Sequence, residues 1–551
     1  MRKWFVLFIT AVFYGQMLSA AGTVQDFYSQ TARQLWSENE IAGRKCGFPQ
    51  VLHAHFQPAF APELQKQKAG LADLDRIYFS PKGHFKIFYT TSGYEAIPLY
   101  DRDSNGLPDF LEFIATAFEN AYEREVVQLG FNPPPDSTGQ PRKRYPIYCR
   151  PLSVYGSTVL DYEIPNLNGL NYATYIEINN DFSFVNYPGV TDPIIRDSLA
   201  IAVTAAHEFQ HALHSGYRLF GDNQGSFRDL WFIEGTAVTM EEYVCPDVND
   251  YLQYIPSYFR FINYPLDDED RYSTAYGRAL FYLQVSQIHG YSVIRQMWQN
   301  YQQPGAVNAI STTLQQIGSS LENELKEHAL WIFFSGKRSI PGQYFTDAAL
   351  FPELPVQDGG GIQSAGNRVL LDSLPRLSMQ WYQVEVQTAQ QTVLQLKAAG
   401  NSSAVDLIGW LVSGSQAQSV NPSQSHILEG NHLGDSLFFA IVNTLKNGSD
   451  YNSYELIARS ENGEIASVYP QPFKWSEATP YIHFDQLPAG AKVYILDSNG
   501  RAVQTLQCKS GAVSVSWDLT NRQGDKVGSG VYIFKAIADN GTKEGKFVVI
   551  R

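Results

Sequence analysis

AHEFQH at residues 206–211, followed by WFIEGTA at residues 231–237, is the part of the sequence that decides the fold of the central region. Two histidines four positions apart lie on one face of a helix, about 6 Å apart along its axis. His207 and His211 can therefore bind one zinc ion, and Glu208 lies beside them as a base for a zinc-bound water. A catalytic zinc ion takes a third protein ligand and keeps its fourth position for water. Glu234 is the candidate third ligand.

The residues around this motif predict a buried helix. The run LAIAVTAA at residues 199–206 is almost entirely apolar, and polar groups in a buried helix need partners. The alternative, a surface helix with two solvated histidines, fits this run less well. An Asp-Pro pair beginning at Asp192 predicts the helix start, and Gly216 predicts its end. His214 lies about 10.5 Å from His207 along the axis, so we interpret it as a packing residue and not as a zinc ligand.

HEFQH and the downstream DLWFIEG segment at residues 229–235 resemble the gluzincin metallopeptidases. The wider stretch at 80–340 resembles a group of secreted bacterial HExxH proteins regarded as metalloproteases. The spacer between the two motifs is longer than in the best-known gluzincins, and Val238 stands where thermolysin-like enzymes have an acidic residue. Glu241 or Glu242 is then expected to orient a ligand histidine. The aminopeptidase GxMEN motif does not occur, which favours an endopeptidase.

The resemblance implies a mechanism in which zinc polarises the scissile carbonyl and Glu208 serves as base and then as proton shuttle. A further hydrogen-bond donor should stabilise the oxyanion. Tyr276 is the candidate donor, and the alternative is a tyrosine buried in the core.

A second metal site is predicted by DRDSNGLPDFLE at residues 101–112, which fits the twelve-residue calcium loop. Gly106 permits the sharp turn, and a helix is expected to follow until Gly130. Pro108 replaces the aliphatic residue that pairs with a second loop, so we expect a single structural calcium site. The alternative is an Asx-rich turn that caps the helix without metal. The expected calcium ligands are Asp101, Asp103, Asn105, Leu107, Asp109 and Glu112.

The N-terminal sequence and the composition indicate where the protein is located and which partners are excluded. The chain has 551 residues and a net charge of −14 without a basic cluster, which argues against nucleic acid or an anionic membrane as partner. Residues 1–21 are typical of a secretory signal peptide, and no transmembrane segment is expected. The protein is therefore expected to be secreted, extracellular or on the bacterial cell surface. Residues 22–80 are either a propeptide or the first layer of the catalytic domain.

Four cysteines in an exported chain allow disulfides in three pairings. They are Cys46, Cys149, Cys245 and Cys508. A pairing among the first three, with Cys508 left over, is favoured.

The remaining patterns divide the chain into domains. Strands are expected at 84–89, 145–148 and 174–178, and the last of these is a candidate edge strand for a bound peptide. With the helices that follow, they predict an α+β catalytic domain at 81–355. Alternating strands then predict a β-sandwich at 366–463. Residues 466–551 resemble the immunoglobulin-like module of flagellar hook-capping proteins and the C-terminal sorting domains of type IX secretion. This resemblance implies contact with secretion machinery or attachment at the cell surface.

The sequence thus predicts a multidomain protein, with an α+β zincin-like catalytic domain followed by two all-β domains. Its expected function is that of a secreted zinc metalloendopeptidase that uses Zn²⁺ and Ca²⁺ and acts on protein or peptide substrates. One alternative is a non-catalytic cell-surface or adhesion protein with a structural metal domain. Another is a zinc hydrolase of non-peptide substrates.

Overall fold

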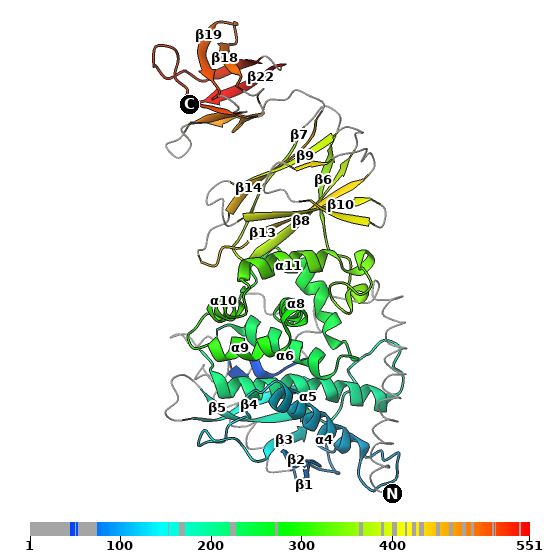
Figure 1. The fold of residues 1–551 in the computed structure, drawn as a ribbon. Helices are drawn as coiled ribbons and strands as arrows, with labels where there is room; N and C mark the ends of the chain where they lie inside the picture. Colours follow the sequence, from blue (N-terminus) through cyan, green and yellow to red (C-terminus); the bar gives the residue numbers. More distant parts are fainter. Residues whose placement is uncertain are drawn as a thin grey trace.

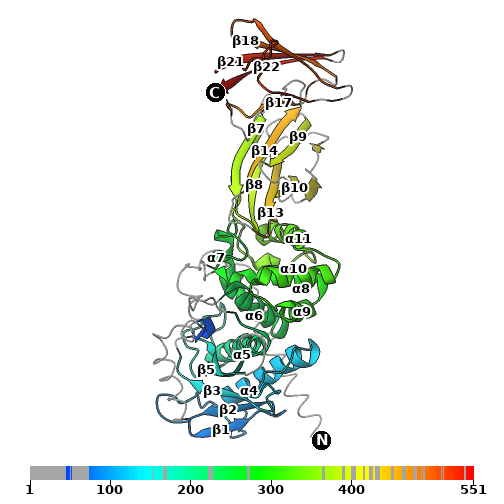
Figure 2. The same ribbon diagram turned by 90° about the vertical axis from the view of Figure 1, so that its left-hand side faces the viewer.

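The computed structural model shows three regions stacked in chain order, with a helical region between β-sheets (Figures 1 and 2). The structure begins with a mixed sheet and its helices, continues into a β-sandwich, and ends in a second all-β unit. It describes residues 45–49, 51–52, 74–152, 154–164, 171–220, 228–269, 274–362, 367–386, 391–398, 405–413, 416–420, 426–428, 435–447, 452–461, 467–475, 481–485, 487, 490–509, 512, 514–538 and 541–551. The expected signal peptide and most of segment 22–80 lie outside these residues.

The first sheet has five strands in the order β1-β2-β3-β5-β4. β2, β3 and β5 run parallel, and β1 and β4 pair antiparallel at the two edges. β5 is buried along its whole length, which fits its inner position. The expectation that the strand at 174–178 is the edge strand is therefore wrong: β4 covers its outer side, and β4 is the edge. The strands are β1 (Arg76–Phe79), β2 (Phe85–Tyr89), β3 (Tyr145–Arg150), β4 (Gly156–Glu163) and β5 (Tyr172–Asn179).

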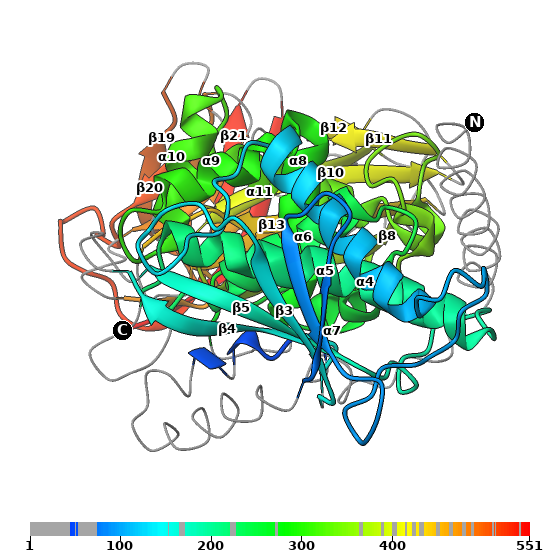
Figure 3. The same cartoon turned by 90° about the horizontal axis from the view of Figure 1, so that it is seen from below.

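Two helices cover one face of this sheet (Figure 3). α4 (Asp109–Ala121) continues as the π-helical segment η4 (Tyr122–Gln128), and its apolar stripe is buried between β2 and α5. α5 (Pro193–Tyr217) begins at Asp192, whose side chain accepts a hydrogen bond from the backbone N–H of Ile194. This N-cap confirms the start predicted from the Asp-Pro pair. α5 lies on β4 and β5 and also contacts α4 and α6, so it is the central helix of the region.

α6 (Leu230–Val244) packs on α5 and is fixed at its start by Asp229. The Asp229 carboxylate accepts hydrogen bonds from Tyr301 Oη at 2.7 Å and from the backbone N–H groups of Gly305 and Ala306 at 2.9 Å. These contacts tie the start of α6 to the start of α10. The elements after α6 are η5 (Asp250–Tyr254), α7 (Ile255–Arg260), η7 (Tyr276–Arg278), α8 (Ala279–His289), α9 (Ser292–Asn300), α10 (Ala306–Gln316), α11 (Leu321–Phe333), η8 (Gly336–Arg338) and η9 (Ala348–Leu350).

The middle region consists of two sheets, of order β11-β10-β13-β8-β6 and β12-β9-β14-β7. It begins with β6, which pairs parallel with β8 and lies before the predicted boundary at residue 366. The alternating pattern predicts strands at 381–386, 392–396, 407–412, 437–442 and 454–458, and each of these falls within an observed strand. The strands are β6 (Gln357–Ile362), β7 (Asn367–Leu374), β8 (Ser378–Val386), β9 (Gln391–Ala398), β10 (Val405–Ser413), β11 (Gln416–Val420), β12 (His426–Leu428), β13 (Ser436–Asn443) and β14 (Asn452–Glu461).

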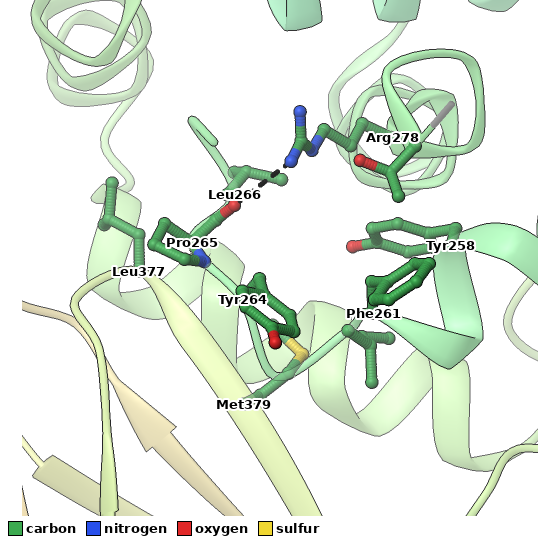
Figure 4. A pocket seen from close by; sticks show the side chains of 10 residues that line it. Tyr258, Phe261, Tyr264, Pro265, Leu266, Arg278, Leu377 and Met379 are labelled. Carbon is green, nitrogen blue, oxygen red and sulfur yellow. Dashed lines mark hydrogen bonds between the residues drawn. The ribbon is translucent and has the colours of Figure 1, made fainter. Parts of the chain in front are cut away.

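The sandwich and the helical region share one hydrophobic core, which includes Phe333, Met379 and Phe438. At the junction the backbone N–H of Leu266 donates to the carbonyl of Leu377 at 2.8 Å. The cavity beside this contact measures only 10 Å³, and Tyr258, Tyr264 and Met379 are among the residues that line it (Figure 4). A space of this size holds about one water, so the junction is a packed interface and not a substrate site.

The C-terminal region has a three-stranded sheet, β15-β17-β20, and a five-stranded sheet, β16-β22-β21-β18-β19. Phe484, Trp517 and Phe547 fill the space between them, with ring centroids 5.5 and 6.0 Å from Phe547. The strands are β15 (Ser467–Tyr469), β16 (Phe473–Lys474), β17 (Ile482–Asp485), β18 (Lys492–Asp497), β19 (Ala502–Gln507), β20 (Val515–Trp517), β21 (Gly530–Ala538) and β22 (Gly541–Ile550).

All four cysteines are free, so the predicted disulfide among the first three is wrong. Cys149 is buried in β3, Cys245 ends α6, and Cys46 precedes the first sheet, so these three sulfurs lie on separate elements. Within the described parts of the chain, no helix has both the length and the apolar character needed to cross a membrane.

Because His328 in α11 is buried, we expect the folded protein to lose stability as the pH falls. The side chain is fully buried, accepts a hydrogen bond at 2.9 Å from Tyr258 Oη, and burial lowers its pKa to about 3. Because the unfolded chain takes up this proton near its ordinary pKa and the folded chain does not, stability falls as pH drops from 6.5 towards 3. Between pH 6.5 and 5 we expect a loss of about 2 kcal/mol, measured by urea unfolding. His328→Gln should reduce this loss, whereas His483→Gln, at an exposed site, should leave it unchanged.

Candidate metal centre

α5 and α6 bring His207, His211 and Glu234 together in the core. The Nε2 atoms of the two histidines are 3.0 Å apart, and the Glu234 oxygens lie 3.2 Å from His207 Nε2 and 3.5 Å from His211 Nε2. All three side chains are at most 1% exposed. Among the described residues neither Glu234 oxygen has a hydrogen-bond partner of good geometry. Buried ligand atoms that converge in this way fit a divalent cation of the zinc type.

The electrostatics of these three residues favour a cation. Burial opposes a charge on His207, but its interactions with Glu234 and Glu241 outweigh burial and raise its pKa to about 9. Burial would also raise the pKa of Glu234, and the two histidines overcome it and lower that pKa to about 2. Glu234 therefore stays negatively charged at zero solvent exposure. A bound cation would take the place of the proton that His207 holds in its absence.

Glu241, one turn after Val238 on α6, orients the first histidine. Its Oε1 atom lies 2.7 Å from His207 Nδ1, which leaves Nε2 free to face the centre. The sequence left Glu241 and Glu242 as alternatives, and the structure places Glu241 at the histidine. Glu242 lies apart from the centre, and burial followed by the charge of Asp347 raises its pKa well above the ordinary value.

Glu208 is held beside the centre by the edge strand β4. The Thr158 hydroxyl lies 2.8 Å from both Glu208 Oε2 and the Glu208 carbonyl, so it can donate to either oxygen. Gly156 permits this approach, because a Cβ atom there would meet Thr204 Cγ2 at 2.7 Å and Glu208 Cγ at 2.9 Å. The side chain of Glu208 is 1% exposed. The Glu208 carboxylate is therefore fixed between the edge strand and the ligand cluster.

Cys46 is a member of the cluster that the sequence did not indicate. Its sulfur lies with the ligand atoms of His207, His211 and Glu234, all within 4.8 Å of one another. Burial, and then the Glu208 and Glu234 carboxylates, raise the pKa of the Cys46 thiol well above its ordinary value. A cation at the centre would reverse this effect and favour the thiolate. No spacing rule connects a cysteine about 160 residues upstream with an HExxH helix.

The structure places the other two candidates close to the centre. His214 is stacked on Trp298, with ring centroids 3.8 Å apart, and lies 2.7 Å from Gln210 Nε2, which fits the predicted packing role. Tyr276 is fully buried, with its ring 6.0 Å from that of His207 and stacked on Tyr254. Its role as an oxyanion donor stays a prediction.

The loop at 101–112, which the sequence predicts to bind calcium, brings several of its carboxylates together. Ligand atoms of Asp101, Asp103 and Asp109 lie within 4.8 Å of one another. Asn105 connects Asp103 with a fourth carboxylate, since its side-chain nitrogen lies 2.9 Å from Asp103 Oδ2 and 3.0 Å from Glu112 Oε1. Two residues after Asn105, the backbone N–H of Leu107 donates to Asn105 Oδ1 at 2.8 Å. Burial is the main cause that raises the pKa values of Asp109 and Glu112, and neighbouring carboxylates add to it.

This loop is also joined to the helix of the metal centre. Arg102 Nη2 donates to Asp192 Oδ2 at 2.6 Å, and Asp192 is the N-cap of α5. Tyr100 Oη donates to Asp197 Oδ2 at 3.3 Å, also on α5. The order of the loop therefore affects the start of the helix that carries His207 and His211.

Comparison with known families identifies the C-terminal region. The family model of the FlgD Ig-like domain matches residues 479–542, and the two-sheet arrangement of this region agrees with it. The chain thus ends in an immunoglobulin-like domain. No curated protein matches the chain significantly.

Two solved structures share local similarity with the chain. One is PorZ of Porphyromonas gingivalis, described as an essential bacterial surface component of the type IX secretion system; it is 27% identical over 17% of this chain and 14% of PorZ, with a TM-score of 0.15. The other is PliG of Aeromonas hydrophila, a periplasmic inhibitor of g-type lysozyme, 10% identical over 19% of this chain and 100% of PliG, also with a TM-score of 0.15. The chain thus spans about a seventh of the length of PorZ and all of PliG.

Proposed function

We propose that this protein is a zinc-dependent metalloendopeptidase with a zincin-like catalytic domain and that His207, His211 and Glu234 hold the zinc ion. The observation that carries the proposal is the position of Glu208, a buried carboxylate fixed by Thr158 beside three converging ligand groups. A purely structural zinc site needs no such base. The mixed sheet, with an antiparallel edge strand next to the HExxH helix, supports the same proposal.

The roles of the protein groups follow from their contacts. Zinc, when bound, supplies a Lewis acid that polarises a carbonyl and lowers the pKa of water. Glu208 accepts the proton of the attacking water and passes it to the leaving amine, and Thr158 holds the carboxylate in position. Glu241 fixes the ring of His207 through Nδ1. β4 is the edge at which an extended peptide can add by backbone hydrogen bonds.

Zinc analysis combined with cleavage of casein and a peptide library tests this function. Because Cys46 lies among the ligands, cleavage is measured for the native chain and for Cys46→Ala, each with and without Glu208→Gln. Zinc in all four proteins and cleavage that depends on Glu208 would support the proposal. Zinc without cleavage in any of them would favour the alternative, a non-catalytic surface or adhesion protein in which Cys46 completes a structural site. Cleavage of esters or amides but not of peptides would favour a hydrolase of other substrates.

We also propose calcium at the loop 101–112, as a structural ion. A cation would relieve the repulsion among Asp101, Asp103 and Asp109 and hold the loop against the start of α5. The calcium-selective chelator EGTA should lower the stability of the domain by about 3 kcal/mol relative to free calcium at roughly 100 times the dissociation constant. Calorimetry with and without the chelator measures this. Asp101→Asn should already melt at the lower temperature and show little further change, and an unchanged native melting curve would contradict calcium.

The site of action is proposed to be outside the cell. The FlgD Ig-like match at 479–542 supports contact of the C-terminal domain with secretion machinery or the cell surface. Fractionation of the producing bacterium, with and without residues 466–551, tests this placement.

A further inference from the structure

A short segment before the first sheet occupies the free edge of β4 at the metal centre. Gly47 N–H donates to the carbonyl of Gly156 at 2.9 Å, Tyr155 N–H donates to the carbonyl of Lys45 at 3.2 Å, and Cys46 pairs with Gly156 in parallel. The opposite side of β4 is paired with β5. Among the described residues, the segment therefore occupies the start of the outer edge of β4, next to Glu208, where an extended substrate would otherwise add.

The segment is fixed on both sides of Cys46. Lys45 Nζ lies 3.0 Å from Glu241 Oε2 and 2.7 Å from Asp250 Oδ2, and all three side chains are buried. Glu241 is also the carboxylate that orients His207. On the other side, the ring of Phe48 is stacked on His211, with centroids 4.5 Å apart and planes inclined by 23°. The segment thus contacts His211 directly and reaches His207 through Glu241, and these contacts hold the sulfur beside the cluster.

We infer that Cys46 is a fourth protein ligand of the same metal ion and that the segment of residues 45–49, 51 and 52 blocks the site until it is displaced. This inference rests on the proposed function. Catalysis requires one ligand position for water, and a sulfur among His207, His211 and Glu234 occupies it. With the segment in place, the site therefore has four protein ligands and no position for water. Without the segment, it has three protein ligands and an open position for water.

The exchange between the Cys46 sulfur and a water molecule at the metal ion involves the loss or gain of one proton by the sulfur. When the sulfur binds the ion, the Cys46 thiol gives up its proton to solvent and the water leaves. When the segment leaves, water returns to the vacated position and the thiolate takes up a proton. No oxidant or other reactant is needed.

Cobalt(II) substitution of the full chain tests the ligand directly, because a thiolate on cobalt gives an intense near-ultraviolet charge-transfer band that nitrogen and oxygen ligands lack. The native chain should show the band. Cys46→Ala and Cys46→Ser should lose it and keep the metal, and Cys149→Ala, a matched change at a buried cysteine of β3, should retain it. Absence of the band from the native protein would overturn the inference, and this measurement needs no variant to fold.

Hydrolysis then separates the inference from the function on which it rests. With the chain shown intact by mass spectrometry, the zinc-loaded Cys46→Ala protein should cleave peptides about tenfold faster than the native protein, or more, because the water position is open. Gly47→Val provides a second route to the same result, since a Cβ at Gly47 would meet Ser157 Cβ and Oγ at 2.8 Å and force the segment from β4. Equal rates of hydrolysis in the native, Cys46→Ala and Gly47→Val proteins would overturn the inference that the segment blocks the site. Loss of the band with zinc retained but no hydrolysis would keep Cys46 as a ligand and contradict the peptidase.

Discussion

Glu208→Gln is expected to lower the rate of peptide hydrolysis by about 10²–10⁴-fold, the usual contribution of general acid–base catalysis. Gln has the size and shape of Glu but cannot accept the proton of the attacking water. The Thr158 hydroxyl can still donate to the amide oxygen, so the side chain should keep its place. Zinc content should not change, because His207, His211 and Glu234 are untouched. The rate is measured in the Cys46→Ala protein, in which the water position is open.

The matched control for this variant is Glu242→Gln. Glu242 lies on α6, is buried, and does not contact the ligand cluster in any described interaction. Since burial and nearby carboxylates raise its pKa well above the ordinary value, the protonated acid and the amide are similar in charge, and the rate should stay close to that of the parent. A Glu208→Gln protein that is as active as the Glu242→Gln control would show that Glu208 is not the base.

The parts of the site that depend on local spacing could be predicted from the sequence. His207 and His211 face the same way because of helical periodicity, and the helix begins at Asp192 because an Asp-Pro pair caps it. Glu234 could be proposed because its helix follows within reach of the first. Their convergence in the core agrees with this spacing.

The parts that depend on tertiary pairing could not be predicted. β5 has the composition of a strand, but nothing in its sequence shows that β4 would pair on its outer side and bring Thr158 to Glu208. From the sequence, Cys46 is only a disulfide candidate like the other cysteines, because no second ligand residue lies near it at the spacing of a metal-binding motif. Its place at the metal centre results from a backbone pairing with Gly156 across more than 100 residues.

Lys45→Met is expected to destabilise the region around α5 and α6 by about 3 kcal/mol, because it removes the cation from a buried ion pair. Burial opposes the charge of Lys45, yet Asp250 and Glu241 outweigh burial and raise its pKa above the ordinary value. Met retains most of the apolar stem and leaves the two carboxylates without their shared partner. The loss of stability should stay near the lower end of the range for such pairs, because each carboxylate retains another partner. Glu241 still interacts with His207 Nδ1, and Asp250 still accepts a hydrogen bond from Gln253 Nε2 at 2.8 Å.

The control is Lys82→Met, which removes an exposed lysine 3.3 Å from Glu123. Exposed pairs contribute about 0–1 kcal/mol, so this variant should unfold almost as the native chain does. Urea unfolding followed by tryptophan fluorescence measures both. A Lys45→Met protein as stable as Lys82→Met would mean that the bonds of Lys45 to Glu241 and Asp250 do not hold the segment on β4. In that case Cys46 would depend on Phe48 and the backbone pairing with Gly156 for its position.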